Sequence, residues 1–463
     1  MSFSEDFVFG GATAAYQIEG AAGADGRGLS IWDVFAHTEG RVVNGDTGDV
    51  AIDHFHRFKD DVAIMAGLGL KDYRFSVSWP RIQPDGRGRG LEAGLDFYSR
   101  LTDELLAAGI TPWVTLYHWD LPQALQEAGG WPERETAQRF ADYAAVVHQH
   151  LGDRVKHWIT LNEPFCSSFI GYASGRHAPG LRDPKAALSS VHHLLLGHGL
   201  ATQALKAQGA EQVGITLNLY AVDPASDSAL DTDAARRVDG FQNRLFLDPV
   251  LKGRYPQDML HDLAEFGGLG EVRDGDLQLI STPIDLLGVN YYTRYVITGN
   301  PDHPDLVGER RGQLDSPYVG APNAREVRHG MPLTDLGWEI DPDGLYDVLT
   351  RLKREYPAIP IVITENGAAF ADVLTDDGAV HDEQRIAYVR DHLAACSRAI
   401  DAGVPLKGYF LWSVFDNFEW AEGYAKRFGV VHVDYETQVR TPKDSALWYS
   451  KVIRSGGSLD DAS

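Results

Sequence analysis

The sequence has very little cysteine and no long apolar run. Only Cys166 and Cys396 occur among the 463 residues, which is too few for a disulfide scaffold and fits a reducing compartment. No window approaches the roughly 18 apolar residues of a membrane-spanning helix. Residues 1–6 are acidic and lack the apolar core of a signal peptide. We therefore expect a cytoplasmic protein that is not inserted into a membrane.

Positive charge is also scarce. The chain carries 42 Lys and Arg against 66 Asp and Glu, a formal net charge of −24. Such an excess repels nucleic acids and anionic membranes, so we expect neither as a partner. No Cys/His cluster has the spacing of a zinc site, and the Gly-rich segment 86–90 lacks the Lys-Ser/Thr ending of a phosphate-binding loop. These absences predict no metal and no cofactor.

The sequence does contain an alternation of strand and helix patterns. Eight strands alternating with helices indicate the α/β class and a single (β/α)8 barrel, in which the active site lies at the C-terminal ends of the strands. The predicted strands are 7–15, 73–79, 110–117, 155–163, 213–219, 285–292, 359–365 and 405–413. The predicted helices are 53–67, 91–108, 135–150, 184–207, 232–247, 341–356, 382–402 and 446–453.

The domain limits follow from this pattern. Residues 1–454 are predicted to form one barrel domain, and residues 455–463 a loose, disordered tail. The stretch 293–338 is rich in Gly, Pro and Asp and predicts a long rim loop. A loop of that length within a compact domain usually serves function, as a lid or rim of the site.

Two predicted strands end on a glutamate. Glu163 follows an apolar run and precedes Pro164, which cannot donate to a sheet ladder, and Glu365 ends a segment of the same form. These are the fourth and seventh strands, so the two carboxyl groups can face each other across the barrel mouth. A carboxyl pair is what glycoside hydrolysis needs, since one group protonates the leaving oxygen and the other attacks or activates water.

Other interpretations remain open at this point. Either glutamate taken singly could be an ordinary strand-end ion-pair partner. A metal-dependent barrel hydrolase would use the same barrel mouth, and a sugar-binding barrel without turnover would carry similar polar residues. Further polar or aromatic side chains at or just after predicted strand ends strengthen the case for a site there: Gln17, His118, Asn162, Asn290, Tyr292 and Trp412.

Several motifs together resemble those of the family 1 glycoside hydrolases, the β-glucosidase family. They run in family order from about residue 7 to residue 450, and their combination is very specific. The motifs are Phe9-Gly-Gly-Ala-Thr-Ala-Ala-Tyr-Gln-Ile-Glu-Gly20, Tyr73-Arg-Phe-Ser-Val-Ser-Trp79, Leu116-Tyr-His-Trp-Asp-Leu-Pro122, Thr160-Leu-Asn-Glu-Pro164, Asn290-Tyr-Tyr292, Gly337-Trp-Glu339, Ile363-Thr-Glu-Asn-Gly367 and the segment from Trp412 to Tyr424.

The resemblance implies a retaining β-glucosidase and a role for each matched residue. Glu163 matches the general acid/base and Glu365 the nucleophile. Arg74 and Tyr292 match residues that support the nucleophile, and Asn162 matches the one that holds the sugar 2-OH. The residues implied to bind the rest of the substrate are Gln17, His118, Trp119, Glu419 and Trp420 at the hydroxyls, Trp412 as the stacking floor, Asn290 near the reacting centre and Trp338 on the aglycone side.

The resemblance also bears on the substrate. Relatives that cleave 6-phospho-sugars lack the glutamate present here as Glu419, so unphosphorylated β-glucosides are favoured and a 6-phospho-β-glucosidase is the alternative. The implied substrates are oligosaccharides and aryl or alkyl β-glucosides, with room for β-galactosidase or β-fucosidase side activity and for transglycosylation. The aglycone and linkage preference and the oligomeric state stay open.

Overall fold

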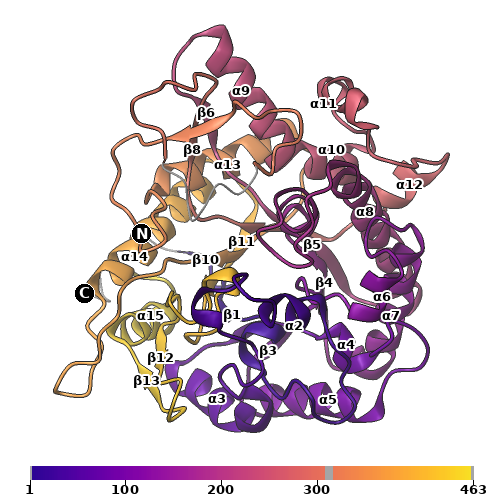
Figure 1. Cartoon of the computed structure of the whole chain (residues 1–463). Coiled ribbons are helices and arrows are strands. Elements are labelled where there is room, and N and C mark those ends of the chain that lie inside the picture. Colours follow the sequence, from indigo (N-terminus) through magenta and orange to yellow (C-terminus); the bar gives the residue numbers. More distant parts are fainter. Residues whose placement is uncertain (1–2, 308–315, 460–463) are drawn as a thin grey trace.

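The computed structural model describes residues 3–307 and 316–459, which form a closed barrel of eight parallel strands in the order β1-β11-β10-β7-β5-β4-β3-β2 (Figure 1). The (β/α)8 prediction is therefore confirmed. The barrel strands are β1 (Val8–Ala12), β2 (Asp72–Ser76), β3 (Thr111–Tyr117), β4 (His157–Asn162), β5 (Gln212–Asn218), β7 (Leu286–Asn290), β10 (Ile361–Asn366) and β11 (Leu406–Trp412).

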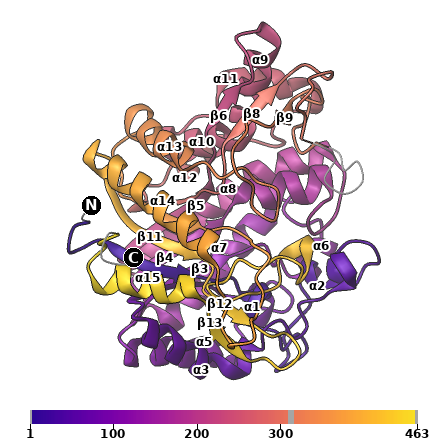
Figure 2. The same ribbon diagram turned by 90° about the vertical axis from the view of Figure 1, so that its left-hand side faces the viewer.

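Helices enclose the barrel, and the connections carry shorter ones (Figures 1 and 2). The long helices are α3 (His54–Leu68), α5 (Glu92–Ala107), α7 (Glu135–Leu151), α8 (Pro184–Ala207), α9 (Ala229–Asp239), α13 (Pro342–Glu355), α14 (Glu383–Asp401) and α15 (Asp444–Arg454). The short ones are α1 (Ala15–Ile18), α2 (Ile31–Ala36), α4 (Trp79–Ile82), α6 (Gln123–Glu127), α10 (Leu245–Lys252), α11 (Gln257–Leu263) and α12 (Asp276–Ile280). Single turns are η1 (Val43–Gly45), η4 (Ala264–Phe266) and η5 (Trp420–Glu422).

Local sequence signals set several of these boundaries. The Asp341 side chain accepts a hydrogen bond from the Gly344 N–H at 2.9 Å, and Pro342 occupies the first helical position of α13, two features that favour a helix start. Trp79, Trp113 and Trp158 are buried in the core. The burial of these large rings agrees with the apolar sequences of the strands that carry or adjoin them.

The helix predicted over 232–247 is wrong as a single element. The segment is divided into α9, the π-helical turn η3 (Gly240–Arg244) and α10. A Cβ on Gly240 would lie 2.1 Å from the sulfur of Met259, so glycine permits a close contact there. The Asn243 side chain also exchanges hydrogen bonds with the backbone of Tyr220 at 3.1 and 2.9 Å. Tertiary contacts therefore reshape the helix.

The stretch 293–338, predicted to be one long loop, contains short strands. It contains β8 (Tyr295–Thr298) and β9 (Arg325–Val327), and residues 308–315 lie outside the described part of the chain. Within the described residues, β8 pairs in parallel with β6 (Val222–Pro224) and antiparallel with β9, as Figure 2 shows above the barrel. The β-branched run in β8 suits a strand. A second small sheet joins β12 (Val431–Val433) to β13 (Arg440–Pro442).

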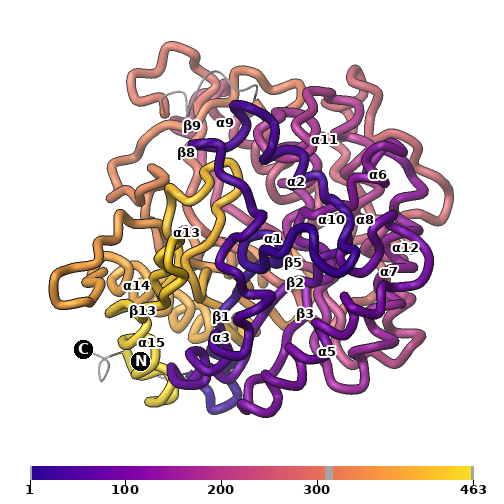
Figure 3. Tube along the Cα trace, turned by 60° about the horizontal axis from the view of Figure 1, so that its bottom comes forward, coloured from indigo at the N-terminus to yellow at the C-terminus, as the bar shows by residue number. Residues whose placement is uncertain are grey.

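The prediction of a loose tail from residue 455 onward is wrong for residues 455–459. Leu459 is buried, and a Cβ on Gly457 would meet the rings of Phe3 and Phe9 at 2.6 and 2.8 Å. The chain after α15 therefore packs against the N-terminal segment, and both lie on the same side of the barrel (Figure 3). Apolar burial explains the order. Residues 460–463 lie outside the described residues.

Candidate active site

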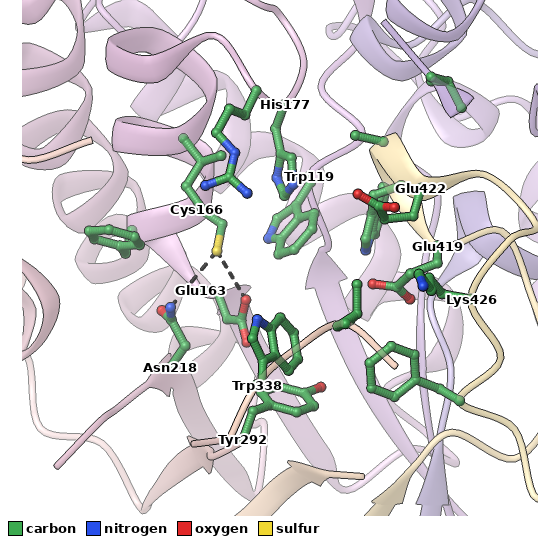
Figure 4. A pocket seen from close by; sticks show the side chains of 18 of the residues that line it. Trp119, Glu163, Cys166, His177, Asn218, Tyr292, Trp338, Glu419, Glu422 and Lys426 are labelled. Carbon is green, nitrogen blue, oxygen red and sulfur yellow. Dashed lines mark hydrogen bonds between the residues drawn. The ribbon is translucent and has the colours of Figure 1, made fainter. Parts of the chain in front are cut away.

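The two strand-end glutamates meet at one cavity. Glu365 lies within β10, and Glu163 follows the last residue of β4; both carboxyl groups line a cavity of about 570 Å³ at the C-terminal ends of the strands. In the barrel order, β4 and β10 are three strands apart, as predicted. Figure 4 shows Glu163 together with Tyr292 and Glu419 around this cavity.

The strands are irregular where these side chains emerge. The register of β10 shifts on its β7 side between Ile363 and Glu365, and that of β4 shifts on its β5 side between Ile159 and Asn162. Glu163 itself has a left-handed backbone with φ 49°. Register shifts of this kind redirect a side chain next to an active site, and a left-handed glutamate is an uncommon conformation held by its surroundings. The local backbone therefore aims both carboxyl groups into the cavity.

Glu365 is held by a cation and a phenol. Arg74 Nη1 donates to Glu365 Oε1 at 2.6 Å, and the Tyr292 hydroxyl donates to Oε2 at 2.7 Å. Arg74 is itself fixed, since Nε donates to Thr115 Oγ1 at 3.0 Å and Nη2 to Asn162 Oδ1 at 2.6 Å. Both members of the Arg74–Glu365 ion pair are buried. These contacts favour the ionised form of Glu365.

Glu163 has neutral partners instead. Asn290 Nδ2 donates to Glu163 Oε1 at 2.7 Å, and the Cys166 thiol donates to Oε2 at 3.2 Å. Burial, and then the negative charge of Glu365, raise the pKa of Glu163 to about 8. Burial also raises the pKa of Glu365, but the charge of Arg74 and the hydrogen bonds of Arg74 and Tyr292 oppose that rise. The pair therefore holds its proton on Glu163 and its charge on Glu365.

This asymmetry predicts a pH dependence. A general acid donates a proton only while it is protonated, so, with Glu163 in that expected role, kcat/KM on an alkyl β-glucoside should fall as the pH rises through about 8. The measurement is a pH profile of kcat/KM between pH 5 and 10, with stability checked at each pH. A profile that stays flat across the alkaline range would contradict a donor role for Glu163.

The other predicted residues fall into two groups around the cavity. Those that line it with the two glutamates are His118, Trp119, Tyr292, Trp338, Trp412, Glu419 and Trp420. Those that are hydrogen-bonded to the lining residues are Gln17, Arg74, Asn162 and Asn290. The structure thus brings all of the predicted side chains together, in these two groups.

Two polar atoms of the inner site are left for a ligand. Gln17 Nε2 donates to Phe418 O at 2.8 Å and to Asn417 Oδ1 at 3.0 Å, whereas its Oε1 has no hydrogen-bond partner among the described residues. His118 Nε2 accepts from Asn162 Nδ2 at 3.0 Å, which places the imidazole hydrogen on Nδ1, and Nδ1 also lacks a partner within the described chain. The site therefore offers one buried acceptor and one buried donor, which suits sugar hydroxyls.

Aromatic rings form the walls of the cavity. The His118 ring is stacked with those of Trp412 and Trp420, at centroid distances of 5.7 and 5.9 Å. Across the cavity, Trp338 packs against Tyr292 at 5.4 Å. Flat apolar surfaces beside hydrogen-bonding groups fit the two faces of a pyranose ring.

Some cavity residues escaped the sequence reasoning. Asn218 ends β5, so the strand-end criterion that identified Asn290 could have found it. Gln242 comes from the π-helical turn and Tyr220 from the loop after β5, and no local pattern marks either as a lining residue. Cys166, which follows Glu163 by three residues, also lines the cavity.

Comparison with known proteins decides the family. The model of glycosyl hydrolase family 1 matches residues 1–458. The chain belongs to this family. It is 48% identical to β-glucosidase A of Thermotoga maritima over 460 residues, covering 99% of each chain, and 48% identical to a bifunctional β-D-glucosidase/β-D-fucosidase of Bifidobacterium breve, covering 98% of each. The psychrophilic β-glucosidase BglU from Micrococcus antarcticus has a similar structure, with a TM-score of 0.96, 51% identity and coverage of 99% and 98%.

Two further findings describe the family 1 chain. None of the helices within residues 3–307 and 316–459 is long and apolar enough to cross a membrane. In the same described ranges, no three His, Cys, Asp or Glu side chains are grouped so that they could hold a metal ion.

Proposed function

We propose that this family 1 chain hydrolyses terminal β-D-glucosyl residues from the non-reducing end of short oligosaccharides, such as cellobiose, and of aryl or alkyl glucosides, with retention of configuration. The observation that supports it best is the unequal environment of the two buried carboxyl groups. Glu365 is paired with Arg74, whereas Glu163 has only neutral donors. A nucleophile and an acid are the two roles that such a pair can fill.

In the first step, Glu365 Oε attacks the anomeric carbon from the face opposite the aglycone. The glycosidic bond breaks, and its electron pair goes to the leaving oxygen, which takes the proton of Glu163. Arg74 and Tyr292 position the attacking carboxylate. The products of this step are a glucosyl–Glu365 ester and an ionised Glu163.

In the second step, Glu163 acts as the base. It removes a proton from a water molecule, whose oxygen attacks the anomeric carbon and displaces Glu365 as a carboxylate. The negative charge thus moves from Glu365 to Glu163 and back, and the ion pair with Arg74 is the one that it forms on Glu365. Two inversions give a β-configured product.

Asn162 is our proposed partner of the sugar 2-OH. Its Oδ1 accepts from Arg74 at 2.6 Å and from Asn290 at 3.1 Å, and its Nδ2 donates to His118. Three partners hold this amide in one orientation beside both glutamates. A 2-OH contact there can strengthen as charge develops at the anomeric carbon.

The substrate preference rests on Glu419 and Lys426. Glu419 lines the cavity opposite Glu163 (Figure 4), and burial, then the charges of Glu365, Glu422 and Glu163, raise its pKa to about 8. Lys426, the cation near it in sequence, binds the Asp335 carbonyl and carboxylate at 2.8 and 2.9 Å. A phosphate would meet a carboxyl group and a cation already paired, so we favour the unphosphorylated sugar. β-Fucosidase side activity is supported by the 48% identical relative whose name gives both β-D-glucosidase and β-D-fucosidase activity.

The test is ¹H NMR of the sugar that is first released from methyl β-glucoside. The rate is then compared with that on the 6-phosphorylated analogue, and with the rate on methyl β-glucoside in the presence of a chelator. We expect β-glucose to appear before mutarotation, little turnover of the phosphorylated analogue, and unchanged rates in chelator. An α-anomer as first product would overturn retention, and a preference for the phosphorylated sugar would favour the 6-phospho-β-glucosidase. Binding without cleavage would favour a sugar-binding barrel, and loss of activity in chelator a metal-dependent hydrolase.

The proposal extends to the domain and the compartment. Residues 1–454 serve as a single catalytic unit, because the carboxyl pair, Arg74 and the cavity walls come from strands all round the barrel.

Both cysteines are free and buried, which agrees with a reducing, cytoplasmic location. Cell fractionation with an antibody to the chain tests the location.

A further inference from the structure

Cys166 lies against the acid/base candidate in an arrangement that the proposed mechanism does not yet use. It is the first residue of the π-helix η2 (Cys166–Ser174), and its N–H donates to Glu163 O at 2.9 Å, which closes a turn around Pro164. The same turn brings Sγ to 3.2 Å from Glu163 Oε2, and Asn218 Nδ2 lies 3.8 Å from Sγ. Figure 4 shows the Cys166 sulfur joined by dashed lines to the Asn218 amide and to the Glu163 carboxyl group at the cavity wall.

The directions of these hydrogen bonds are determined by their donors. The Asn218 amide donates to the sulfur, which leaves the S–H to point at Glu163. Burial, and then the charge of Glu163, raise the pKa of the Cys166 thiol well above its usual range, so it remains a donor. The chain of donors therefore runs from the end of β5 through the thiol to one oxygen of Glu163.

The two oxygens of Glu163 have donors of different strength. Oε1 accepts the Asn290 amide at 2.7 Å, so the acidic proton belongs on Oε2. Oε2 receives the thiol, which is a weak donor. A strong donor to Oε2 would stabilise the carboxylate, so Glu163 would be a weaker base and would be reprotonated less readily. With no donor, the oxygen would be free to rotate away.

We propose that Cys166 is a positioning residue for Glu163, whose thiol orients the proton-carrying oxygen toward the leaving group while leaving it basic enough to accept a proton from water. The inference rests on the proposed function, because it needs Glu163 as the acid/base. It adds a residue that acts through Glu163 and has no bond-making role of its own.

Several charged or titratable groups surround this carboxyl group and must stay constant in a test. They are Arg74 from β2, Glu365 from β10, Tyr292 after β7, Tyr220 after β5, Glu419 after β11 and, on the Cys166 side, Arg176 after η2. Substitutions at Cys166 leave all of them in place, so a moved pH limb would report the lost or strengthened donor.

The experiment compares pH profiles of kcat/KM for Cys166→Ala and Cys166→Ser with wild type on an alkyl β-glucoside. Removing the thiol takes away a donor to the carboxylate, so we expect the alkaline limb of Cys166→Ala to move up by about half a pH unit, the scale of one weak hydrogen bond. A hydroxyl is a stronger donor, so the limb of Cys166→Ser should move down. Asn218→Ala, which removes the donor that orients the thiol, should move it up, by less than Cys166→Ala.

The matched control is Cys396→Ala, which removes the other buried thiol from α14, and its limb should coincide with that of wild type. Limbs that do not move in the Cys166 variants, or that move in the same direction in both, would overturn the positioning role. If a Cys166 variant fails to fold, Asn218→Ala still decides the direction. A 2,4-dinitrophenyl glucoside, which needs no acid, separates the two proposals: if the alkaline limb is identical for the alkyl and the dinitrophenyl glucoside in wild type, it belongs to another titrating group such as Glu419, and Glu163 is refuted as the acid.

Discussion

Glu365→Gly is expected to lower kcat on an aryl β-glucoside by roughly 10⁵-fold, the scale at which enzymes with covalent intermediates lose activity without their nucleophile. Removal of the carboxylate leaves Arg74 and Tyr292 in place around a vacant space. A small anion such as azide or formate can occupy that space beside Arg74 and attack the anomeric carbon directly. Since this is a single displacement, added azide should restore turnover and give the inverted α-glucosyl azide.

The measurement is the rate of aryl alcohol release with and without azide, together with NMR of the glucosyl product. Glu211→Gly is the control, because Glu211 is an exposed glutamate that precedes the N-terminal end of β5 and the same substitution there should leave kcat near that of wild type. Substantial activity of Glu365→Gly without the anion would show that another group is the nucleophile. A β-configured azide would lead to the same conclusion.

Glu163→Ala is expected to have an effect that depends on the leaving group. An alkyl alcohol needs its oxygen protonated as it departs, so kcat/KM for an alkyl glucoside should fall about 10²- to 10⁴-fold, the usual worth of a general acid. A 2,4-dinitrophenolate leaves without a proton, so kcat/KM for that glucoside should stay near the wild-type value. Its kcat and KM should both fall, because the glucosyl–Glu365 ester accumulates when no base activates water.

Azide distinguishes this variant from the first. It attacks the ester from the face that Glu163 normally serves, so it should raise kcat for the dinitrophenyl glucoside and yield the β-glucosyl azide. The alkaline limb attributed to the raised pKa of Glu163, at about 8, should be absent from the variant. Equal losses for both leaving groups would contradict the acid role and indicate a general structural defect.

The sequence predicts elements well where a local signal is strong. The eight strands of the described barrel and the α13 cap follow from apolar runs, a capping aspartate and a helix-initial proline. It fails where a contact distant in sequence competes with a local pattern. The Asn243 side chain binds the Tyr220 backbone and interrupts an apparently continuous helix, and Leu459 is buried although its neighbours are Gly, Ser and Asp.

The candidate site shows the same division. Glu163 and Glu365 could be paired from the sequence, since each follows an apolar strand and parallel strands in a barrel end at one face. Asn218 carried the same strand-end signal. Gln242 and Tyr220 reach the cavity through an irregular turn and a loop, whose conformations depend on tertiary packing and leave no periodic pattern.

The barrel, the family and the two carboxyl groups at the barrel mouth can all be inferred from the sequence. How the two carboxyl groups differ depends on the folded chain. Arg74 is 291 residues from Glu365 and Tyr292 is 73, while Asn290 is 127 residues from Glu163, so no local pattern reports which glutamate receives a cation and which receives neutral donors. Only the closed barrel brings these partners within hydrogen-bonding distance, and in a buried site those contacts favour the proton on one carboxyl group and the charge on the other.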